Sequence, residues 1–240
     1  MASLPASLTL IRHAESAGNV ANDSAIRAGL AELDLAQRDM DVPLSPLGEE
    51  QAGALGGWFA SRPAPAAVVC SPYKRAADTA LLAMQCGGVE CEVILDERLR
   101  EREFGILDRL TKRGIEERFP EQAAARAFLG KFFHRPPGGE SWADVAGRVR
   151  SVVTDLRLDF EGRDVVLVTH QAVITVFRYV LERLTEPELL AIDASTQIAN
   201  TAVTTYVSDG DRMRLDAFND VSHLEPAETT ASPDRSVAPR

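Results

Sequence analysis

Short runs of apolar, β-prone residues recur along the chain, and each run ends where polar or charged residues begin. The clearest are Leu8–Ile11, Ala66–Cys70 and Val165–Thr169, and Glu90–Leu95 is a shorter run of the same kind. Continuous apolar runs bounded by polar residues are typical of strands that are buried on both faces of a parallel sheet. The pattern therefore predicts an α/β fold.

Helix starts are marked by capping residues. Ser45-Pro46 and Ser71-Pro72 each place a capping serine before a proline, which is preferred at the first helical position. Ser141 with Asp144 resembles a capping box, and the apolar residues that follow step by three and four along a long helix. We therefore predict a three-layer sandwich in which helices flank a mostly parallel central sheet.

One segment interrupts this pattern. Within residues 104–140, two short helical patterns over residues 111–133 are separated by Pro120 and are followed by a loop rich in proline and glycine. We interpret this helical and loop insert as a lid that covers a site, with ordinary core packing as the alternative. Further along, Thr201–Val207 and Arg212–Phe218 surround Asp209-Gly210 and predict a hairpin.

The end of the chain lacks periodicity. From residue 221 onward the sequence is polar and contains three prolines, so we predict a disordered tail over residues 221–240. The preceding residues 1–220 are predicted to form one α/β domain. Removal of residues 225–240 is accordingly expected to leave catalysis unchanged.

Composition and charge exclude several partners. The chain has 240 residues, 45% of them hydrophobic, which is enough for one large core. A formal net charge of −10 argues against nucleic acid or an anionic membrane as a partner. Three cysteines without CxxC spacing indicate reduced thiols, and the amino terminus has no signal-peptide pattern. We therefore expect a cytoplasmic protein.

Ionisable residues follow the predicted strands where the strands end. Arg12 and His13 follow the first strand, Arg75 falls in the first turn of the helix after the second, and His170 follows the clearest strand. Because the carboxyl ends of parallel strands meet at one edge of a sheet, these side chains are expected to converge. A neutral imidazole can attack phosphorus, and the planar guanidinium group matches phosphate oxygens. A lone Arg-His pair is more often structural, so this interpretation depends on the convergence.

Two further segments extend the predicted anion site. The run from Ser16 to Asn19 combines small residues with an amide donor, and its backbone and side-chain N–H groups suit a phosphate. Glu101 and Glu103 lie in a highly charged segment after the third strand, a composition that ordinarily indicates solvent exposure. The four histidines lack the HxxxH or HExxH spacing of zinc sites, so neither a metal nor another cofactor is expected.

These motifs, in this order, resemble the histidine phosphatase superfamily. Its members include cofactor-dependent phosphoglycerate mutases, fructose-2,6-bisphosphatases and broad-specificity phosphatases, and the resemblance spans roughly residues 8–207. Arg12-His13-Ala14-Glu15-Ser16 with Asn19 is similar to the RHGxS signature, with alanine where glycine is usual. The other matching segments are Ser71–Ala80 for the second phosphate arm, Leu99–Gly105 for the proton donor and Thr169–Ala172 for the second histidine, where Gln171 replaces a common glycine.

The resemblance implies a role for each of these residues. His13 would attack a phosphomonoester to form a phosphohistidine, with Arg12, Arg75 and His170 taking part in catalysis and in binding the substrate. Glu101 would be the proton donor, because its spacing to Gly105, unlike that of Glu103, matches the family. Ser16 and Asn19 would complete the substrate site.

Three functions remain open at this point. A phosphatase acting on a small phosphorylated metabolite, closest in character to the broad-specificity branch, is favoured. A phosphoglycerate mutase is less favoured, because the residues after Glu101 differ from the Arg-His-Tyr-Gly-Ala-Leu-Gln typical of mutases. A catalytically silent phospho-ligand binding protein is least favoured, since every catalytic residue type is present. A second copy of the chain is a further candidate partner.

Overall fold

Within residues 3–232, the part of the chain that the computed structural model describes, six strands form one sheet in the order β3-β2-β4-β1-β5-β6. In chain order they are β1 (Ser7–Arg12), β2 (Ala67–Cys70), β3 (Glu92–Leu95), β4 (Asp164–Thr169), β5 (Val203–Ser208) and β6 (Met213–Asp220). β3, β2, β4 and β1 pair in parallel, whereas β5 is antiparallel to both β1 and β6. The predicted mostly parallel sheet and its terminal hairpin are confirmed.

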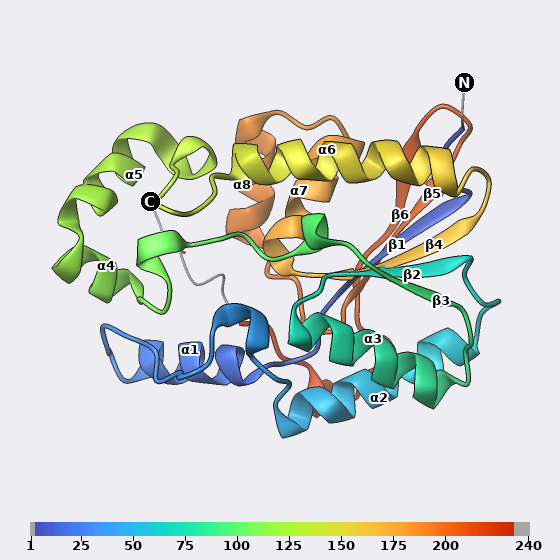
Figure 1. Cartoon of the computed structure of the whole chain (residues 1–240), viewed down its shortest axis with the longest axis horizontal. Helices are drawn as coiled ribbons and strands as arrows, with labels where there is room; N and C mark the ends of the chain where they lie inside the picture. The colour runs from blue at the N-terminus through green and yellow to red at the C-terminus, as the bar shows by residue number, and fades with distance from the viewer. Residues whose placement is uncertain (1–2, 233–240) are drawn as a thin grey trace.

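Helices cover both faces of this sheet (Figure 1). On one side lie α6 (Trp142–Asp159), α7 (Gln171–Leu181) and α8 (Glu186–Ser195), and on the other lie α2 (Pro46–Ala60) and α3 (Lys74–Gly87). The predicted caps Ser45 and Ser141 do cap α2 and α6. Among the described residues, no helix is long and apolar enough to cross a membrane.

The central strand β1 contributes side chains to two separate cores. Leu8 and Leu10 pack in the core that includes Trp142 and Phe177, whereas Ile11 packs in the core beneath α2 and α3. Burying a side chain of this size stabilises the fold by about 1.5–3 kcal/mol. Because both faces of β1 are covered, its sequence is a continuous apolar run rather than an alternating one. The three-layer prediction is therefore confirmed.

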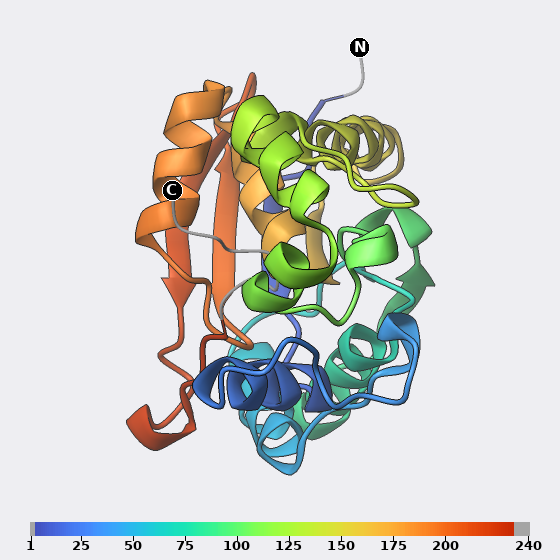
Figure 2. The same cartoon turned by 90° about the vertical axis from the view of Figure 1, so that its left-hand side faces the viewer.

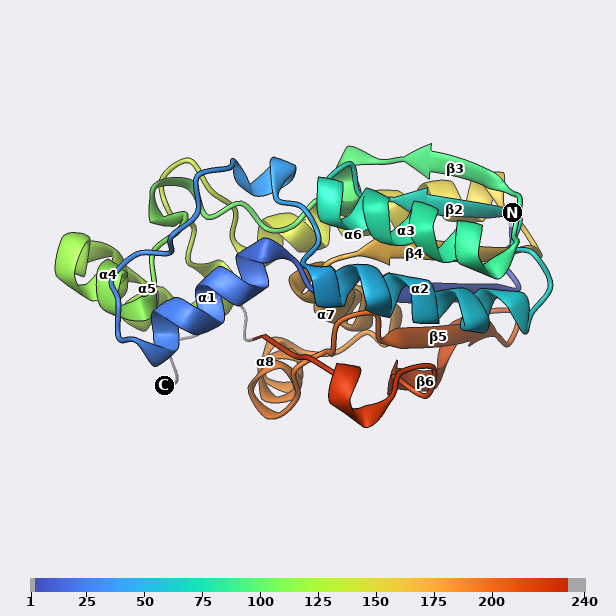
Figure 3. The ribbon, with the colours of Figure 1, turned by 90° about the horizontal axis from the view of Figure 1, so that it is seen from below.

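The insert lies beyond the carboxyl ends of the parallel strands (Figures 1 and 3). It contains α4 (Lys112–Arg118) and α5 (Pro120–Phe133), which face the viewer in Figure 2. Lys131 of α5 forms a 2.6 Å ion pair with Asp193 of α8 and lies 4.7 Å from the centre of the Trp142 ring. The insert is thus attached to the domain, at the end of the sheet where the predicted site lies.

A second attachment joins the insert to the loop after α1 (Ala17–Arg27). The Thr111 backbone N–H donates to the Ala31 carbonyl, and the Leu33 N–H donates to the Arg109 carbonyl. Gly114 lies so close to Ala31 that an added Cβ would stand 1.9 Å from the Ala31 oxygen, so only glycine fits there. The insert and the loop after α1 therefore pack directly against each other.

The predicted disordered tail is wrong for residues 221–232. This segment contains a 3₁₀ turn at Pro226–Glu228, and Ser232 is buried. Its polar groups bond to polar residues of the domain: Gln51 Nε2 donates to the Glu228 carbonyl, and the Asn200 N–H donates to the Thr230 carbonyl. A polar, aperiodic sequence is ordered here because its hydrogen-bond partners lie elsewhere in the chain. The remainder of the predicted tail, residues 233–240, lies outside the described residues.

Candidate active site

His13 follows the last residue of β1 and is 3% exposed. Its backbone N–H donates to the Thr169 carbonyl at 2.9 Å, which joins the ends of β1 and β4. Its ring Nδ1 lies 2.7 Å from the Ala14 carbonyl oxygen. A carbonyl oxygen only accepts, so Nδ1 carries a proton, and in the neutral imidazole the lone pair is then on Nε2. The fold therefore favours the tautomer of His13 in which Nε2 could attack phosphorus, and its role as nucleophile stays a prediction.

The loop after His13 is held by α2. The Glu15 N–H donates to Gln51 Oε1 at 2.8 Å, and the Ser45 N–H donates to the Glu15 carbonyl at 3.0 Å. An added Cβ on Gly48 would stand 1.9 Å from that same carbonyl oxygen, so the helix approaches this closely only because residue 48 is glycine. These contacts hold the loop after His13 closely against α2.

Ser16 and Asn19 form the cap of α1. The Asn19 N–H donates to Ser16 Oγ, and Asn19 Oδ1 accepts from the Ser16 N–H at 3.0 Å. The amide oxygen of Asn19 is therefore engaged within the cap, and its Nδ2 is the group that suits an anion. Both residues lie at the N-terminus of α1, where partial positive charge favours an anion. Their part in substrate binding stays a prediction.

His170 lies at the end of β4, fully buried, with its ring centre 5.0 Å from that of His13. The pKa of His170 lies well below its ordinary value, mainly because the ring is buried and secondly because of the positive charge of Arg75. The ring is therefore neutral near pH 7. Its Nε2 lies 2.8 Å from Ser71 Oγ, whereas its buried Nδ1 has no hydrogen-bond partner within residues 3–232. A buried polar atom without a partner is rare, so this Nδ1 has the capacity to bond to a ligand.

The structure corrects the predicted role of Ser71. The helix after β2 begins at Lys74 with Tyr73 as its N-cap, two residues beyond the expected serine cap. The Ser71 hydroxyl bonds to His170 instead and accepts from the Tyr73 N–H at 3.3 Å. Ser71 therefore orients the second histidine, a function that its sequence context did not reveal.

Arg75 still falls in the first turn of α3, as predicted, and is 3% exposed. Its guanidinium group donates from Nη1 to the Asp39 carbonyl at 2.6 Å and pairs with the Asp39 carboxylate at 3.2 Å. The Tyr73 ring lies 5.1 Å from Arg75 and 5.3 Å from the His170 ring. Arg75 thus belongs to the buried cluster around His170 and not to a solvated basic face.

Arg12 completes the basic lining of the site. It is 3% exposed, its backbone N–H donates to the Ala202 carbonyl at 3.2 Å, and its Nη1 donates to the Ile198 carbonyl. These contacts lie at the end of β1 and before β5, so the guanidinium group is anchored beside His13. Arg12, Arg75 and His13 thus all lie near enough to His170 to act on its pKa, and the roles of these residues in catalysis stay predictions.

The two candidate acids differ in their surroundings. Glu101 follows Leu99, whose carbonyl accepts from Thr169 Oγ1 at 2.7 Å, so its segment is fastened next to His170. Glu103 instead accepts a 2.5 Å hydrogen bond from the Tyr73 hydroxyl. The pKa of Tyr73 is raised, mainly because the ring is buried and secondly because of this bond to Glu103. The hydroxyl therefore stays protonated. The choice of Glu101 as proton donor stays a prediction, and Glu103 is identified as a partner of Tyr73.

Asn200 and Thr201 were not identified from the sequence. Asn200 Nδ2 donates to the His13 carbonyl at 3.0 Å, and the Thr201 N–H lies 3.4 Å from the same oxygen. Thr201 has a φ of 56°, a left-handed conformation that costs a β-branched residue about 1–3 kcal/mol. No local pattern marks these residues, because their partner is 187 positions away from Asn200.

Comparison with known proteins identifies the family. The model of the histidine phosphatase superfamily (branch 1) matches residues 8–221. The chain belongs to this superfamily. The family predicted from the motifs is therefore confirmed, and the match extends to the end of β6.

Several relatives of this chain are named as enzymes, and the first of them is much longer than the chain. It is 34% identical over 175 residues to the bifunctional protein Rv2228c of Mycobacterium tuberculosis, covering 70% of this chain but only 44% of that protein. It is 30% identical to the glucosyl-3-phosphoglycerate phosphatase of the same organism, covering 88% and 93% of the two chains. It is 28% identical to a metal-independent phosphoserine phosphatase of Arabidopsis thaliana, covering 90% and 82%.

A solved structure shows the same fold. The mycobacterial glucosyl-3-phosphoglycerate phosphatase Rv2419c in complex with inorganic phosphate superposes with a TM-score of 0.71 at 29% identity, covering 91% of this chain and 99% of that one. The chain thus shares a full-length fold with a phosphatase, whereas it spans less than half of the first relatives by sequence.

The histidine phosphatase signature departs from the usual pattern at Ala14. This residue is fully buried, its N–H donates to Thr79 Oγ1 at 3.0 Å, and it is not among the residues with positive φ. The backbone therefore does not require glycine here, and an alanine methyl group fits without strain.

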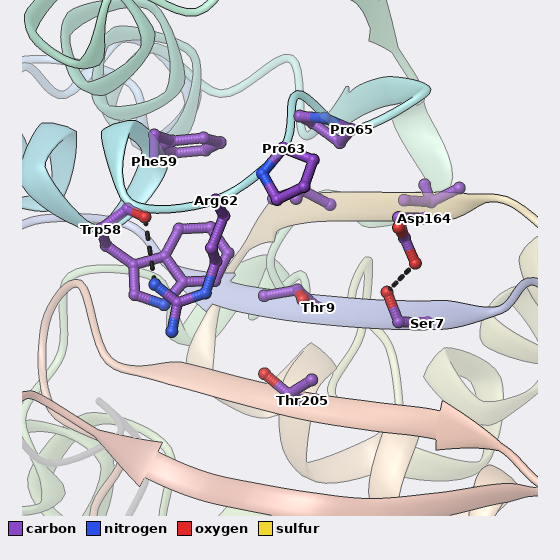
Figure 4. A pocket seen from close by; sticks show the side chains of 11 residues that line it. Ser7, Thr9, Trp58, Phe59, Arg62, Pro63, Pro65, Asp164 and Thr205 are labelled. Atoms are coloured by element: carbon purple, nitrogen blue, oxygen red, sulfur yellow. Dashed lines mark hydrogen bonds between the residues drawn. The ribbon is translucent and has the colours of Figure 1, made fainter.

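A cavity lies away from these residues (Figure 4). It has a volume of about 170 Å³ and is found where β1 and β4 begin, beside Ser7 and Asp164. Trp58, Pro63 and Arg62 form its wall, and the Arg62 guanidinium lies 4.3 Å from the centre of the Trp58 ring. Since the site residues follow the carboxyl ends of the same strands, this cavity is at the opposite end of the sheet.

Arg75→Ala is expected to lower kcat/KM by about 10- to 100-fold, mainly through KM, because a charge-assisted hydrogen bond to an anion is worth about 1.5–3 kcal/mol. Steady-state kinetics and inhibition by inorganic phosphate measure the loss. Arg38→Ala is the matched control, since Arg38 has 72% side-chain exposure and pairs with Asp41. An unchanged KM in Arg75→Ala would mean that Arg75 only holds Asp39.

Proposed function

We propose that this histidine phosphatase hydrolyses phosphomonoesters of a small metabolite through a phosphohistidine on His13. The observation that carries the proposal is the hydrogen bond from His13 Nδ1 to the Ala14 carbonyl, which places the lone pair of the neutral imidazole on Nε2. The neutral, buried His170 with its unpartnered Nδ1 lies beside it, as a phosphoryl-binding group would. Nucleophile and anion site thus occur together.

In the first step, His13 Nε2 attacks phosphorus and the bond from phosphorus to the leaving oxygen breaks. Arg12, Arg75 and His170 donate hydrogen bonds to the three equatorial oxygens, where negative charge gathers in the transition state. Glu101 gives its proton to the leaving oxygen, so the product departs as an alcohol. The N-termini of α1 and α3 add partial positive charge.

In the second step, a water molecule attacks the phosphohistidine. Glu101, now a carboxylate, takes the proton of that water, the bond between phosphorus and Nε2 breaks, and phosphate leaves. The enzyme returns to its starting protonation state. In this scheme the guanidinium groups take the part that a metal ion plays in other phosphatases, and we propose that the reaction is metal-independent.

The relatives support the reaction class and suggest substrates. Glucosyl-3-phosphoglycerate and phosphoserine are the phosphate esters named for two of them. For this chain we propose a small phosphorylated metabolite that binds at the carboxyl ends of the parallel strands, where the insert lies beyond them. The insert would act as a lid there, since it lies beyond the strand ends that carry His13 and His170.

Phosphate release from a panel of phosphomonoesters tests the proposal. The panel contains glucosyl-3-phosphoglycerate, phosphoserine and p-nitrophenyl phosphate, with isomerisation of 3-phosphoglycerate measured in parallel and EDTA present throughout. We expect hydrolysis of at least one ester and no faster isomerisation. Isomerisation that outpaces hydrolysis would assign a mutase, and the absence of both activities would assign a binding protein.

A further inference from the structure

The segment that follows β6 runs back to the site end of the domain. Residues 223–232, here called the strap, turn at Pro226–Glu228 and then pass toward α1 (Figure 3), where Ser232 Oγ donates to Asp23 at 2.8 Å. The strap carries no residue of the proposed chemistry. Its hydrogen bonds to the domain nevertheless gather on a few buried residues.

The strap bonds to three of the residues that hold the loop bearing His13. Gln51 Nε2 donates to the Glu228 carbonyl at 2.6 Å and to Thr230 Oγ1 at 2.8 Å. Asn200 donates its backbone N–H to the Thr230 carbonyl at 2.8 Å and accepts from Thr230 Oγ1 at 3.1 Å. His223 Nε2 lies 3.1 Å from Thr201 Oγ1.

Those three residues in turn contact the loop that bears His13. Gln51 accepts from the Glu15 N–H, while Asn200 and Thr201 direct their N–H donors at the His13 carbonyl. Gln51 and Asn200 are fully buried. Each bonds to the loop through one polar group of its side-chain amide and to the strap through the other. Thr230 Oγ1 lies within hydrogen-bond distance of both, so this one hydroxyl links the two supports.

We propose that the strap is a positioning element for the nucleophile: it orients the side-chain amides of Gln51 and Asn200, and these fix the His13 loop for attack. The inference rests on the proposed role of His13. A side-chain amide can rotate by half a turn, and each outer partner selects the orientation that presents the correct group to the loop. The strained backbone of Thr201 is likewise held through His223. Removal of the strap is therefore expected to impair catalysis, contrary to the expectation from its sequence.

Thr230→Val tests this proposal, because it removes the linking hydroxyl and keeps a β-branched side chain of the same shape. We expect kcat to fall by about three- to tenfold with little change in KM, since a small misplacement of the nucleophile slows the chemical step. Thr229→Val is the matched control: Thr229 is exposed and should show wild-type kinetics. Thr230→Ser retains the hydroxyl and should recover most of the loss.

The outcomes separate positioning from simple stabilisation. Thermal unfolding is measured for each variant, and kcat is compared well below the unfolding range. A raised KM with unchanged kcat would mean that the strap contacts substrate, and equal losses in Thr229→Val and Thr230→Val would indicate a general effect. Either result overturns the proposal, as does a kcat that stays at the wild-type value.

A measurement without substrate keeps this inference distinct from the proposed function. Side-chain ¹⁵N chemical shifts of His13 report its tautomer and surroundings in the resting protein. We expect them to change in Thr230→Val and not in Thr229→Val. If the wild-type protein forms no phosphohistidine, the proposed function fails, and these shifts still decide whether the strap positions His13.

Discussion

His13→Ala is expected to abolish turnover while the fold is kept. The substitution removes the only group that can accept the phosphoryl group in the proposed reaction, and the surrounding loop remains bonded to Gln51 and Ser45 through Glu15. Wild-type protein incubated with ³²P-labelled substrate and quenched in alkali should carry label that is stable in base and lost in acid. His13→Ala should carry none.

His134→Ala is the control for this experiment. It removes another buried imidazole, located after α5 and bonded to Gln122, and should leave the label on the protein. Circular dichroism and thermal unfolding establish that both variants are folded. Label on a serine, or a wild-type rate in His13→Ala, would contradict the phosphohistidine mechanism.

Glu101→Gln is expected to slow hydrolysis of alkyl phosphates by about 10²–10⁴-fold, the usual contribution of a general acid. An alkoxide is a poor leaving group, so its departure requires the proton that glutamine cannot supply. p-Nitrophenolate leaves with little protonation, and its phosphate ester should lose much less rate. The ratio of the two losses therefore identifies the proton donor and not merely a residue that supports the fold.

Glu103→Gln provides a matched control from the same segment. A glutamine amide oxygen can still accept the hydrogen bond from Tyr73, so the cluster of Tyr73, Arg75 and His170 should be preserved. We expect this variant to be nearly silent with both substrates. If the leaving-group-dependent loss appears in Glu103→Gln instead, the proton donor is Glu103. The choice of Glu101 from its spacing to Gly105 is then wrong.

The local features of the chain were predictable because they depend on neighbours in sequence. Strand runs such as Leu8–Ile11 are apolar throughout because both faces of the sheet are covered, and Ser45 and Ser141 cap the helices that they precede. Parallel strands then bring their ends to one edge, which is why His13 and His170 meet at 5.0 Å. The layered fold followed from these patterns, and the family followed from the resemblance of the motifs at the strand ends.

The supports of the site depended on tertiary structure. The Ser71-Pro72 pair has the same sequence whether it caps a helix or forms a turn. Only the approach of His170, 99 positions away in the chain, decides where the Ser71 hydroxyl bonds. The polar sequence after residue 220 resembles a disordered segment because a hydrogen-bonding side chain is ordered only when its partner is near. For Thr230 those partners are Gln51 and Asn200, which the finished fold places beside it. The sequence by itself thus determined which groups meet at the strand ends, whereas the fold decided which buried amides and hydroxyls hold them, because those bonds join residues that no local pattern connects.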